Sequence, residues 1–214
     1  MDHTVAAQLE RGKHDKKLRQ QALRDAATGV FAEKGYDCAT TREVAERAGC
    51  SEGLIHRYFG GKRGLLLDIL RGKTEAAAAV MLESLADSDD LCAEVEAFVS
   101  WWLDYTWDVR DFMRVAVARS VVDEEVARLI SELNHQRINV IADKLRRHQR
   151  AGRVRAEVDC EAIAAGMSSY MFAAGFFTQV VFQHDRKELR SRAAEMARAV
   201  TRGIRTSGTE GGQP

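Results

Sequence analysis

Residues 40–59 read TTREVAERAGCSEGLIHRYF, and this stretch decides the fold. Thr40 is followed three residues later by Glu43, which is the spacing of a capping box. In this motif each side chain accepts a hydrogen bond from the backbone N–H of the other residue at the start of a helix. The short helix is expected to end at Gly49, because glycine adopts the positive φ of a tight turn.

A second short helix is expected after this glycine. Ser51 can cap its first turn, and Leu54, Ile55 and Tyr58 give it an apolar face. Two short helices joined by a glycine-containing turn of three or four residues form a helix-turn-helix, whose second helix enters the major groove of DNA. We therefore expect this motif over about residues 39–58.

Longer helices are predicted on both sides of the motif. Apolar residues recur about every four positions over residues 18–30, and Gly35 stands where a left-handed cap would end that helix. Lys62 begins the next long helix after a glycine pair. These elements predict a DNA-binding domain over residues 15–76, preceded by a polar, mobile arm at residues 1–14.

The rest of the chain is also predicted to be helical. Residues 91–105 carry an apolar stripe with spacings of four and three. Trp102 lies on this stripe, whereas the adjacent Trp101 points about 100° away from it. Asp123 and Asp159 can cap two further helices, the second of them reaching to about residue 182. Together with the first third, this pattern predicts an all-α fold with about nine helices.

The composition is that of an ordinary soluble globular protein, and the length allows one large domain or two small ones. The chain has 214 residues, with 45% hydrophobic and 30% charged residues. An N-terminal three-helix DNA-binding domain is followed by a helical domain over residues 77–206 and a disordered tail at residues 207–214. The formal net charge is zero, but residues 1–63 carry +3, which is compatible with phosphate contact. The four cysteines form no CxxC pair, which favours reduced cytosolic thiols over a zinc site.

Residues 16–76 resemble the DNA-binding domain of the TetR family of transcriptional regulators. The matching elements are Phe31 and Gly35, the block TTREVAERAG, the ending RYF of the second short helix, and Lys62. The resemblance implies a homodimer that binds double-stranded DNA at a palindromic operator and represses transcription until a small-molecule effector binds. It implies a cytoplasmic, nucleoid-associated protein without enzyme activity, cofactor, metal or membrane partner. The recognition helices of the dimer would lie about 34–36 Å apart or somewhat more.

The resemblance also assigns DNA contacts. Thr40, Thr41 and Lys62 would bind phosphate, and Arg42 would reach a phosphate or a base edge. His56 and Tyr58 exchange the residue types that the family usually has at these two positions, which alters the contact geometry. The expected DNA-binding residues are Thr40, Thr41, Arg42, Ser51, Glu52, Gly53, Leu54, His56, Arg57, Tyr58 and Lys62.

Purely structural or solvent-exposed roles compete with several of these DNA-contact assignments. Glu52 can accept from cytosine N4 or face solvent, and solvent is favoured because a carboxylate repels phosphate. Arg42 can be a solvated surface charge, and Tyr58 can simply pack against Phe59. The basic residues of the N-terminal arm can enter the minor groove or remain a solvated tail.

The second domain contains the predicted ligand and dimer surfaces. Family members usually bind a small molecule among their middle helices, although ordinary core packing is at least an equal alternative for each aromatic residue. His135 and Arg137 lie within or beside an apolar helix face and need polar partners, which a ligand or, equally, the protein itself can supply. The candidate ligand residues are Trp102, Tyr105, Phe112, Met113, His135, Arg137, Phe172 and Phe176. Small residues at four-residue spacing allow close approach of helices in a dimer, and the candidate dimer residues are Ala165, Ser169, Ala173, Phe177, Met196 and Val200.

Two other kinds of function compete with this one. Glu132 and His135 form a single Glu-x-x-His pair, whereas a di-iron bundle enzyme needs two such pairs and further glutamates. An activator or a DNA-architectural protein of the same fold is the closer alternative, because repression depends on where the operator lies relative to the promoter. A redox switch at Cys38 or Cys50 is weighed against inert thiols, which are favoured.

Overall fold

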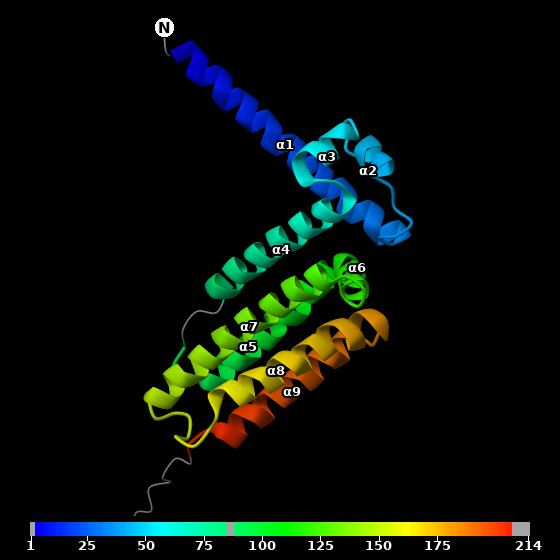
Figure 1. The fold of residues 1–214 in the computed structure, drawn as a ribbon. Helices are drawn as coiled ribbons and strands as arrows, with labels where there is room; N and C mark the ends of the chain where they lie inside the picture. Colours follow the sequence, from blue (N-terminus) through cyan, green and yellow to red (C-terminus); the bar gives the residue numbers. More distant parts are fainter. Residues whose placement is uncertain (1–2, 85–87, 207–214) are drawn as a thin grey trace, which may run out of the picture. The chain divides into compact units, whose positions relative to one another are not determined.

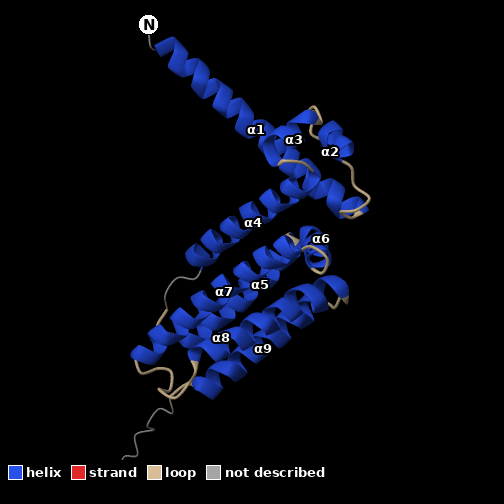
Figure 2. Cartoon of the chain, viewed as in Figure 1, coloured by secondary structure: helices blue, strands red, loops and turns tan. Residues whose placement is uncertain are grey.

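The structure is a computed structural model that describes the backbone of residues 3–84 and 88–206 and the side chains of residues 14–73 and 88–206. The predicted disordered tail at residues 207–214 lies outside the described residues. Regular structure in the described part is helical, apart from one β-bridge between Val154 and Arg205 (Figures 1 and 2). The all-α prediction is therefore confirmed. The elements are α1 (His3–Lys34), α2 (Thr41–Arg47), α3 (Gly53–Phe59), α4 (Lys62–Ser84), α5 (Leu91–Asp108), α6 (Arg110–Ser120), α7 (Glu124–Arg150), α8 (Cys160–Phe172), the π-helix η1 (Ala173–Val181) and α9 (Arg186–Ile204).

The chain forms two compact units whose boundaries differ from the predicted domains. The first unit contains residues 1–75 and 114–129, and the second contains residues 76–113 and 130–214. The predicted boundary near residue 76 is close to the observed one, but residues 114–129 belong with the DNA-binding part rather than with the second domain. A charged contact accounts for the place of this segment in the first unit, because Asp123 within it pairs with Arg63 of α4.

The first helix is longer than predicted. It begins at His3. The sequence predicts a mobile arm over residues 1–14, because apolar periodicity starts only at about residue 16. Residues 3–15 contain Ala, Gln, Leu and Glu, which are strong helix formers, and contain no proline. High helix propensity therefore extends this helix without an apolar stripe that periodicity could detect.

The core of the first unit is apolar and centres on α1. Leu23 and Phe31 of α1 are buried, as are Ile55 of α3 and Leu65 and Leu66 of α4. The turns between these helices have the glycine conformations that the sequence predicts, with φ +77° at residue 35 and +62° at residue 49. This core fixes the directions of α2 and α3 relative to α1.

The core of the second unit centres on α5, which packs against α9, η1 and α8 (Figure 1). Val95, Phe98 and Trp102 of the predicted stripe are buried, whereas the adjacent Trp101 is only half-buried. The expected orientation of the two tryptophans is confirmed. Asp159 caps α8 by accepting hydrogen bonds from the backbone N–H groups of Glu161 and Ala162.

The helix predicted over residues 163–182 changes from α to π geometry at Ala173. The indole Nε1–H of Trp102 donates a hydrogen bond to the carbonyl of Met171 at 2.8 Å. A side-chain donor inserted at a helix carbonyl competes with the usual backbone ladder, and such sites favour π-helical turns. Gly175 meets α5 at this point, where an added Cβ would lie 2.8 Å from Thr106 Oγ1 and 2.9 Å from Trp102 Nε1.

The Gly175→Ala variant should therefore be destabilised. Its methyl group has no room beside Trp102 and Thr106, and overpacking of this kind costs about 1–3 kcal/mol. Chemical denaturation measures the free energy of unfolding. The matched control is Gly72→Ala in α4, where a Cβ meets nothing within 4 Å and should be neutral or stabilising by up to about 1 kcal/mol. Equal effects of the two substitutions would contradict the close approach of Gly175 to α5.

Candidate nucleic-acid interface

The capping box that the sequence predicts is present at the start of α2. Thr40 Oγ1 accepts a hydrogen bond from the Glu43 backbone N–H at 3.2 Å, and Glu43 Oε2 accepts one from the Thr40 N–H at 3.0 Å. Lys34 at the end of α1 also pairs with Glu43. The hydrogen bond from Lys34, and then those from the Thr40 backbone and hydroxyl, lower the pKa of Glu43 to about 2. The box therefore fixes α2 against the end of α1.

The start of α3 differs in one detail from the prediction. Ser51 was expected to cap this helix with its hydroxyl, but the N-cap residue is Glu52 and has no side-chain capping bond. Glu52 already has helical dihedral angles, with φ −58° and ψ −35°. The first helical bond therefore runs from the Leu54 N–H to the Ser51 carbonyl at 3.1 Å, without the hydroxyl.

The recognition helix α3 has one buried side and one polar side. Ile55 is fully buried, whereas Ser51, Glu52 and Gly53 at its start and His56 and Arg57 within it are exposed. Leu54 and Tyr58 are half-buried. The Tyr58 ring packs edge-on against Phe59, with 6.3 Å between centroids, and Lys16 Nζ lies 5.6 Å from its centroid. Most of the predicted base-reading residues therefore share an accessible surface.

Glu52 connects the two helices of the motif. Its carboxylate accepts a hydrogen bond from the Thr41 hydroxyl at 2.5 Å. Sequence reasoning missed this contact, because the two residues are separated by eleven positions across the turn and neither spacing nor periodicity relates them. The prediction that Glu52 faces solvent agrees with its exposed side chain. The Thr41 hydroxyl, a predicted phosphate donor, is thus already bound to a carboxylate.

Arg42 and Lys62 occupy different environments. The Arg42 side chain is 79% exposed, and its Nε donates to Glu46 Oε1 at 2.9 Å, one helical turn away. Exposed pairs of this kind are weak and can open at little cost. Lys62 is half-buried at the start of α4, where its Nζ donates to the Asp37 carbonyl at 3.2 Å and lies 4.5 Å from the Tyr36 ring centroid. Burial lowers the pKa of this lysine.

Asp123 joins three helices of the first unit. As predicted, its carboxylate caps α7, accepting from the backbone N–H groups of Glu125 at 3.1 Å and Val126 at 3.4 Å. Arg63 of α4 donates to both carboxylate oxygens, at 3.0 and 2.9 Å. Arg119 of α6 lies 3.6 Å away. The Arg63 hydrogen bonds and the α7 backbone N–H groups outweigh desolvation and lower the pKa of Asp123 to about 2.

The predicted ligand residues of the second unit are only partly brought together. Trp102 and Arg137 are buried and in contact, with 4.2 Å from the guanidinium carbon to the ring centroid. Tyr105 is half-buried beside Trp102. Phe112 and Phe176 are also buried, and Met113 and Phe172 are half-buried. His135 is exposed, and its Nδ1 lies 2.8 Å from the Ser131 carbonyl of its own helix, so it is not among the buried candidates.

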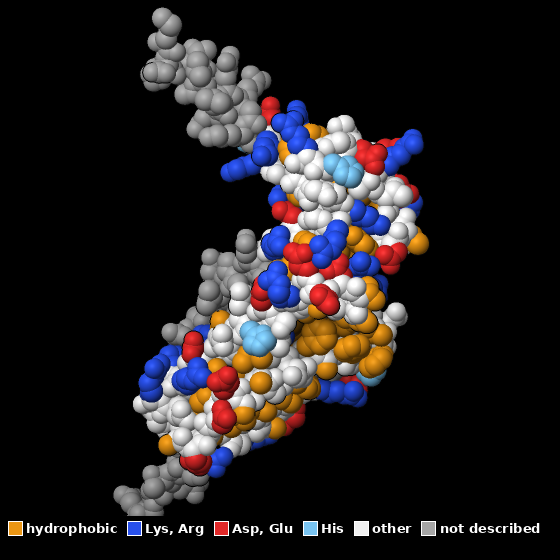
Figure 3. All heavy atoms as spheres, in the orientation of Figure 1, with side chains coloured by type: hydrophobic (Ala, Val, Ile, Leu, Met, Phe, Trp, Pro, Cys, Tyr) orange, Lys and Arg blue, Asp and Glu red, His pale blue; other side chains and the backbone are white. Residues whose placement is uncertain are grey.

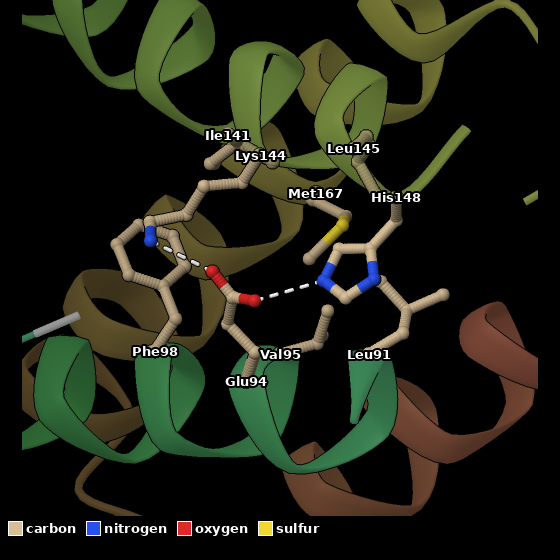
Figure 4. Close-up of a pocket in the computed structure, with 9 residues that line it drawn as sticks. All are labelled: Leu91, Glu94, Val95, Phe98, Ile141, Lys144, Leu145, His148 and Met167. Atoms are coloured by element: carbon tan, nitrogen blue, oxygen red, sulfur yellow. Dashed lines mark hydrogen bonds and ion pairs between the residues drawn. The ribbon is translucent and has the colours of Figure 1, made fainter. Parts of the chain in front are cut away.

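A small cavity in the second unit has a charged wall that the sequence analysis missed (Figure 4). Its volume is about 20 Å³, room for about one water molecule. Glu94 accepts hydrogen bonds there from Lys144 at 2.7 Å, Arg147 at 2.5 Å and His148 at 2.8 Å. Burial raises the pKa of Glu94, but the hydrogen bonds from Lys144 and His148 outweigh burial and the net pKa is lowered. The signal was available, because Glu94 lies three residues after Leu91 and thus on the apolar stripe.

The remaining lining of the cavity is apolar. It comes from α5, α7 and α8, and its residues are Leu91, Val95, Phe98, Ile141, Leu145 and Met167.

The predicted dimer residues lie at the surface or are half-buried. Ser169, Ala173 and Phe177 are exposed, and the half-buried ones are Ala165, Met196 and Val200. Two further apolar residues after Phe177 are also exposed, Val181 by 47% and Phe182 by 62%. Nothing in the periodicity distinguished them from core residues at the end of a buried helix.

The chain is similar in sequence to known bacterial regulatory proteins. The family model described as bacterial regulatory proteins, tetR family, matches residues 23–69. A transcriptional repressor of the helix-turn-helix type from Mycobacterium tuberculosis is 30% identical over 146 residues, which cover 68% of this chain and 74% of that protein. The chain belongs to the TetR family. The repressor KstR2 of Rhodococcus jostii is 29% identical over 151 residues, covering 67% of this chain and 71% of KstR2.

Solved structures support the TetR fold over more of the chain. A TetR-family regulator from Mesorhizobium loti has a TM-score of 0.75 and 15% identity, covering 89% of this chain and 98% of that one. The family match and the repressor relative make the protein a DNA-binding transcriptional regulator, as predicted. Within the described residues, no helix is long and apolar enough to cross a membrane, and no three His, Cys, Asp or Glu side chains are grouped to hold a metal ion.

The stability of this TetR-family protein should depend on Asp123 at acidic pH. The folded pKa of about 2 lies below the ordinary value near 3.9, so the stabilisation is present above about pH 4 and is lost as pH falls toward 2. Asp123→Asn should lower the free energy of unfolding at pH 7 by about 1–2 kcal/mol and flatten its decline between pH 4 and 2. Urea denaturation across this range measures both effects.

The neighbouring variant Glu124→Gln is the control, because Glu124 is exposed. It should keep the wild-type pH profile. A profile that is equally steep in Asp123→Asn would show that the Asp123 carboxylate does not carry the acid dependence.

Proposed function

We propose that this protein is a ligand-responsive repressor that binds a palindromic operator as a homodimer. The observation that carries the proposal is the polar, exposed side of α3 above the buried Ile55, held by the capping box of α2. Such an arrangement can insert a helix into the major groove without disturbing the core. The two curated relatives described above are named repressors, which supports repression over activation. DNA binding would place the protein in the cytoplasm, on the nucleoid.

The DNA-contacting residues divide by chemistry. Ser51, Gly53 and Leu54, with His56, Arg57 and Tyr58, would meet base edges and the flanking backbone. Thr40 and Arg42 would meet phosphate from the start of α2. Thr41 and Glu52 would take up DNA contacts only when the hydrogen bond between their side chains opens. Lys62 would bind phosphate from the first turn of α4, where the helix dipole also favours an anion.

Specific recognition separates the proposal from an architectural role. Selection of genomic fragments bound by the full-length protein, followed by footprinting, should give protection of one short imperfect palindrome. Uniform coating of DNA would support the architectural alternative, and a site upstream of a promoter whose genes need the protein for expression would support an activator.

The dimer surface is proposed on η1 and the residues that follow it. Phe177, Val181 and Phe182 are 41%, 47% and 62% exposed, respectively. Contiguous exposed apolar residues of this size usually mark an interaction surface. The Phe177 and Phe182 rings are neighbours, with 6.4 Å between centroids. Small neighbours on the same run, Ser169 and Ala173, would allow a second copy to approach closely.

Coupling between ligand and DNA can run through α7. This helix begins in the first unit, where Asp123 caps it, and continues into the second unit beside the cavity. A ligand that binds one conformation of the second unit more tightly would shift the population of both ends of this helix. A ligand that left operator affinity unchanged would contradict the coupling, although not DNA binding.

The Arg42→Ala variant tests the phosphate contact. If Arg42 binds phosphate, operator and non-operator affinity should both fall, and the slope of log K against log salt should flatten by about one unit. Fluorescence anisotropy at several salt concentrations measures this slope. Arg47→Ala is the control on the same helix, because Arg47 pairs with Glu33 of α1 and should leave the slope unchanged. A loss restricted to one base position would mean that Arg42 reads a base instead.

The Phe177→Asp variant tests the dimer surface. A charge within an apolar interface has no partner there, so the variant should be monomeric at micromolar concentration and bind the operator at least about 30-fold more weakly. Analytical ultracentrifugation gives the oligomeric state, and circular dichroism confirms folding. Val121→Asp is the control, since Val121 is 83% exposed outside this surface. A Phe177→Asp protein that remains dimeric would refute this location.

A further inference from the structure

Among the residues whose side chains the structure describes, no carboxylate balances the buried charge of Arg137. Arg137 lies on α7 and is 8% exposed. Its Nε donates to Ser168 Oγ at 2.7 Å, and its Nη2 donates to Asn134 Oδ1 at 2.6 Å. The Ser168 hydroxyl donates to the same Asn134 oxygen at 2.8 Å, which closes a triangle of neutral partners. Within the part of the chain that the structure describes, no carboxylate forms an ion pair with this guanidinium.

The lack of a carboxylate counter-ion distinguishes Arg137 from the other buried charged groups among the described residues. Asp123 faces Arg63, and Glu94 faces Lys144 and Arg147. An unpaired buried ion costs several kcal/mol. Desolvation lowers the pKa of Arg137 to about 10, which still leaves it charged at neutral pH. A costly cation retained in this position is explained if its counter-ion is a ligand.

An aromatic cluster begins at this cation. The Trp102 ring lies under the guanidinium, and the Tyr105 ring lies 5.9 Å from Trp102 and 5.3 Å from Trp101, centroid to centroid. Tyr105 also interacts electrostatically with Arg137, which opposes the increase in the tyrosine pKa caused by burial. The site therefore offers one positive charge beside flat apolar surfaces.

The cavity in Figure 4 lies along the same helices as this site. Phe98 of its wall lies four residues before Trp102 on α5, and Ile141 lies four residues after Arg137 on α7. Residues four apart share one face of a helix. With room for about one water molecule, the cavity admits a carbon skeleton only if its side chains move. A ligand with a carbon skeleton would therefore bind a conformation of the second unit in which these side chains have moved. An allosteric effector must prefer one conformation in this way.

We propose that Arg137 is the anion-binding residue of the effector site and that the effector is a singly charged organic carboxylate with an apolar or aromatic body. A guanidinium binds a carboxylate through two parallel hydrogen bonds. One negative charge balances Arg137, whereas a phosphate dianion would leave surplus charge in apolar surroundings. This proposal rests on the ligand response proposed above and names the chemical class of the ligand.

Paired probes test the class on the full-length protein. Phenylacetate and octanoate are compared with phenylacetamide and octanamide, which have the same shapes without the charge. The carboxylates should raise the Tm by about 3–5 °C at ten times their Kd, and the amides should not. Phenyl phosphate should bind more weakly than phenylacetate. Equal shifts from amides, a larger shift from phenyl phosphate, or no shift from either carboxylate would overturn the proposal.

A substitution of Arg137 tests the residue. Arg137→Met removes the charge with little change of length, so carboxylate affinity should fall by at least about 30-fold, while the Tm of the free protein is kept or raised. A purely structural role would instead lower the Tm and leave affinity unchanged. If this variant fails to fold, Arg137→Lys keeps the charge but loses the paired bonds, and should still bind about tenfold more weakly.

A matched control comes from the same unit. Arg186 also lies over a tryptophan, with 4.6 Å to the Trp107 centroid, but it is paired with Asp104. Arg186→Met should leave carboxylate affinity unchanged, and a loss equal to that in Arg137→Met would overturn the assignment of the site.

Operator affinity separates failure of this proposal from failure of the proposed function. If carboxylates raise the Tm but leave operator affinity unchanged, the carboxylate class stands and ligand-responsive repression fails. If operator affinity responds only to the neutral amides, ligand-responsive repression stands and the carboxylate class fails.

Discussion

The carboxylate of Asp123 is the contact on which the DNA-binding unit depends. It caps α7, receives two hydrogen bonds from Arg63 and lies beside Arg119, so one side chain connects α4, α6 and α7. Arg63 directly follows Lys62, which is the residue proposed to bind a DNA phosphate. The segment of residues 114–129 therefore belongs to the unit that positions the helix-turn-helix, although it is distant in sequence. One carboxylate therefore joins the start of α7 to the first turn of α4.

In the second unit, Trp102 is the side chain that contacts several elements at once. Its indole N–H binds the Met171 carbonyl, its ring lies under Arg137, and its edge faces Gly175. The change from α8 to the π-helix η1 occurs two residues after that carbonyl, at Ala173. Trp102 thus contacts both the point where α8 changes to the π-helix η1 and Arg137, the charged residue of the proposed effector site.

Local patterns predicted most of the first unit. The capping box, the glycine turns and the start of α4 at Lys62 depend on neighbours within a few residues, and each was found as expected. The Asp123–Arg63 and Thr41–Glu52 contacts join residues far apart in the chain, so no periodicity could reveal them. The early start of α1 was missed because propensity, rather than an apolar stripe, maintains that helix. The position of Glu94 on the stripe could have indicated a buried charge.

The acidic residues around the helix-turn-helix have a consequence for how the protein finds its target. Arg47 is paired with Glu33, Lys34 with Glu43, and the Thr41 hydroxyl with Glu52, whereas the exposed Arg42–Glu46 pair can open at little cost. Attraction to arbitrary DNA comes from cations that replace the counter-ions of phosphate. Cations already neutralised within the protein contribute little to that attraction, so residence on unrelated sequence is short and discrimination depends on the bases that α3 meets. The internal ion pairs therefore lower the attraction to unrelated DNA that these cations could otherwise supply.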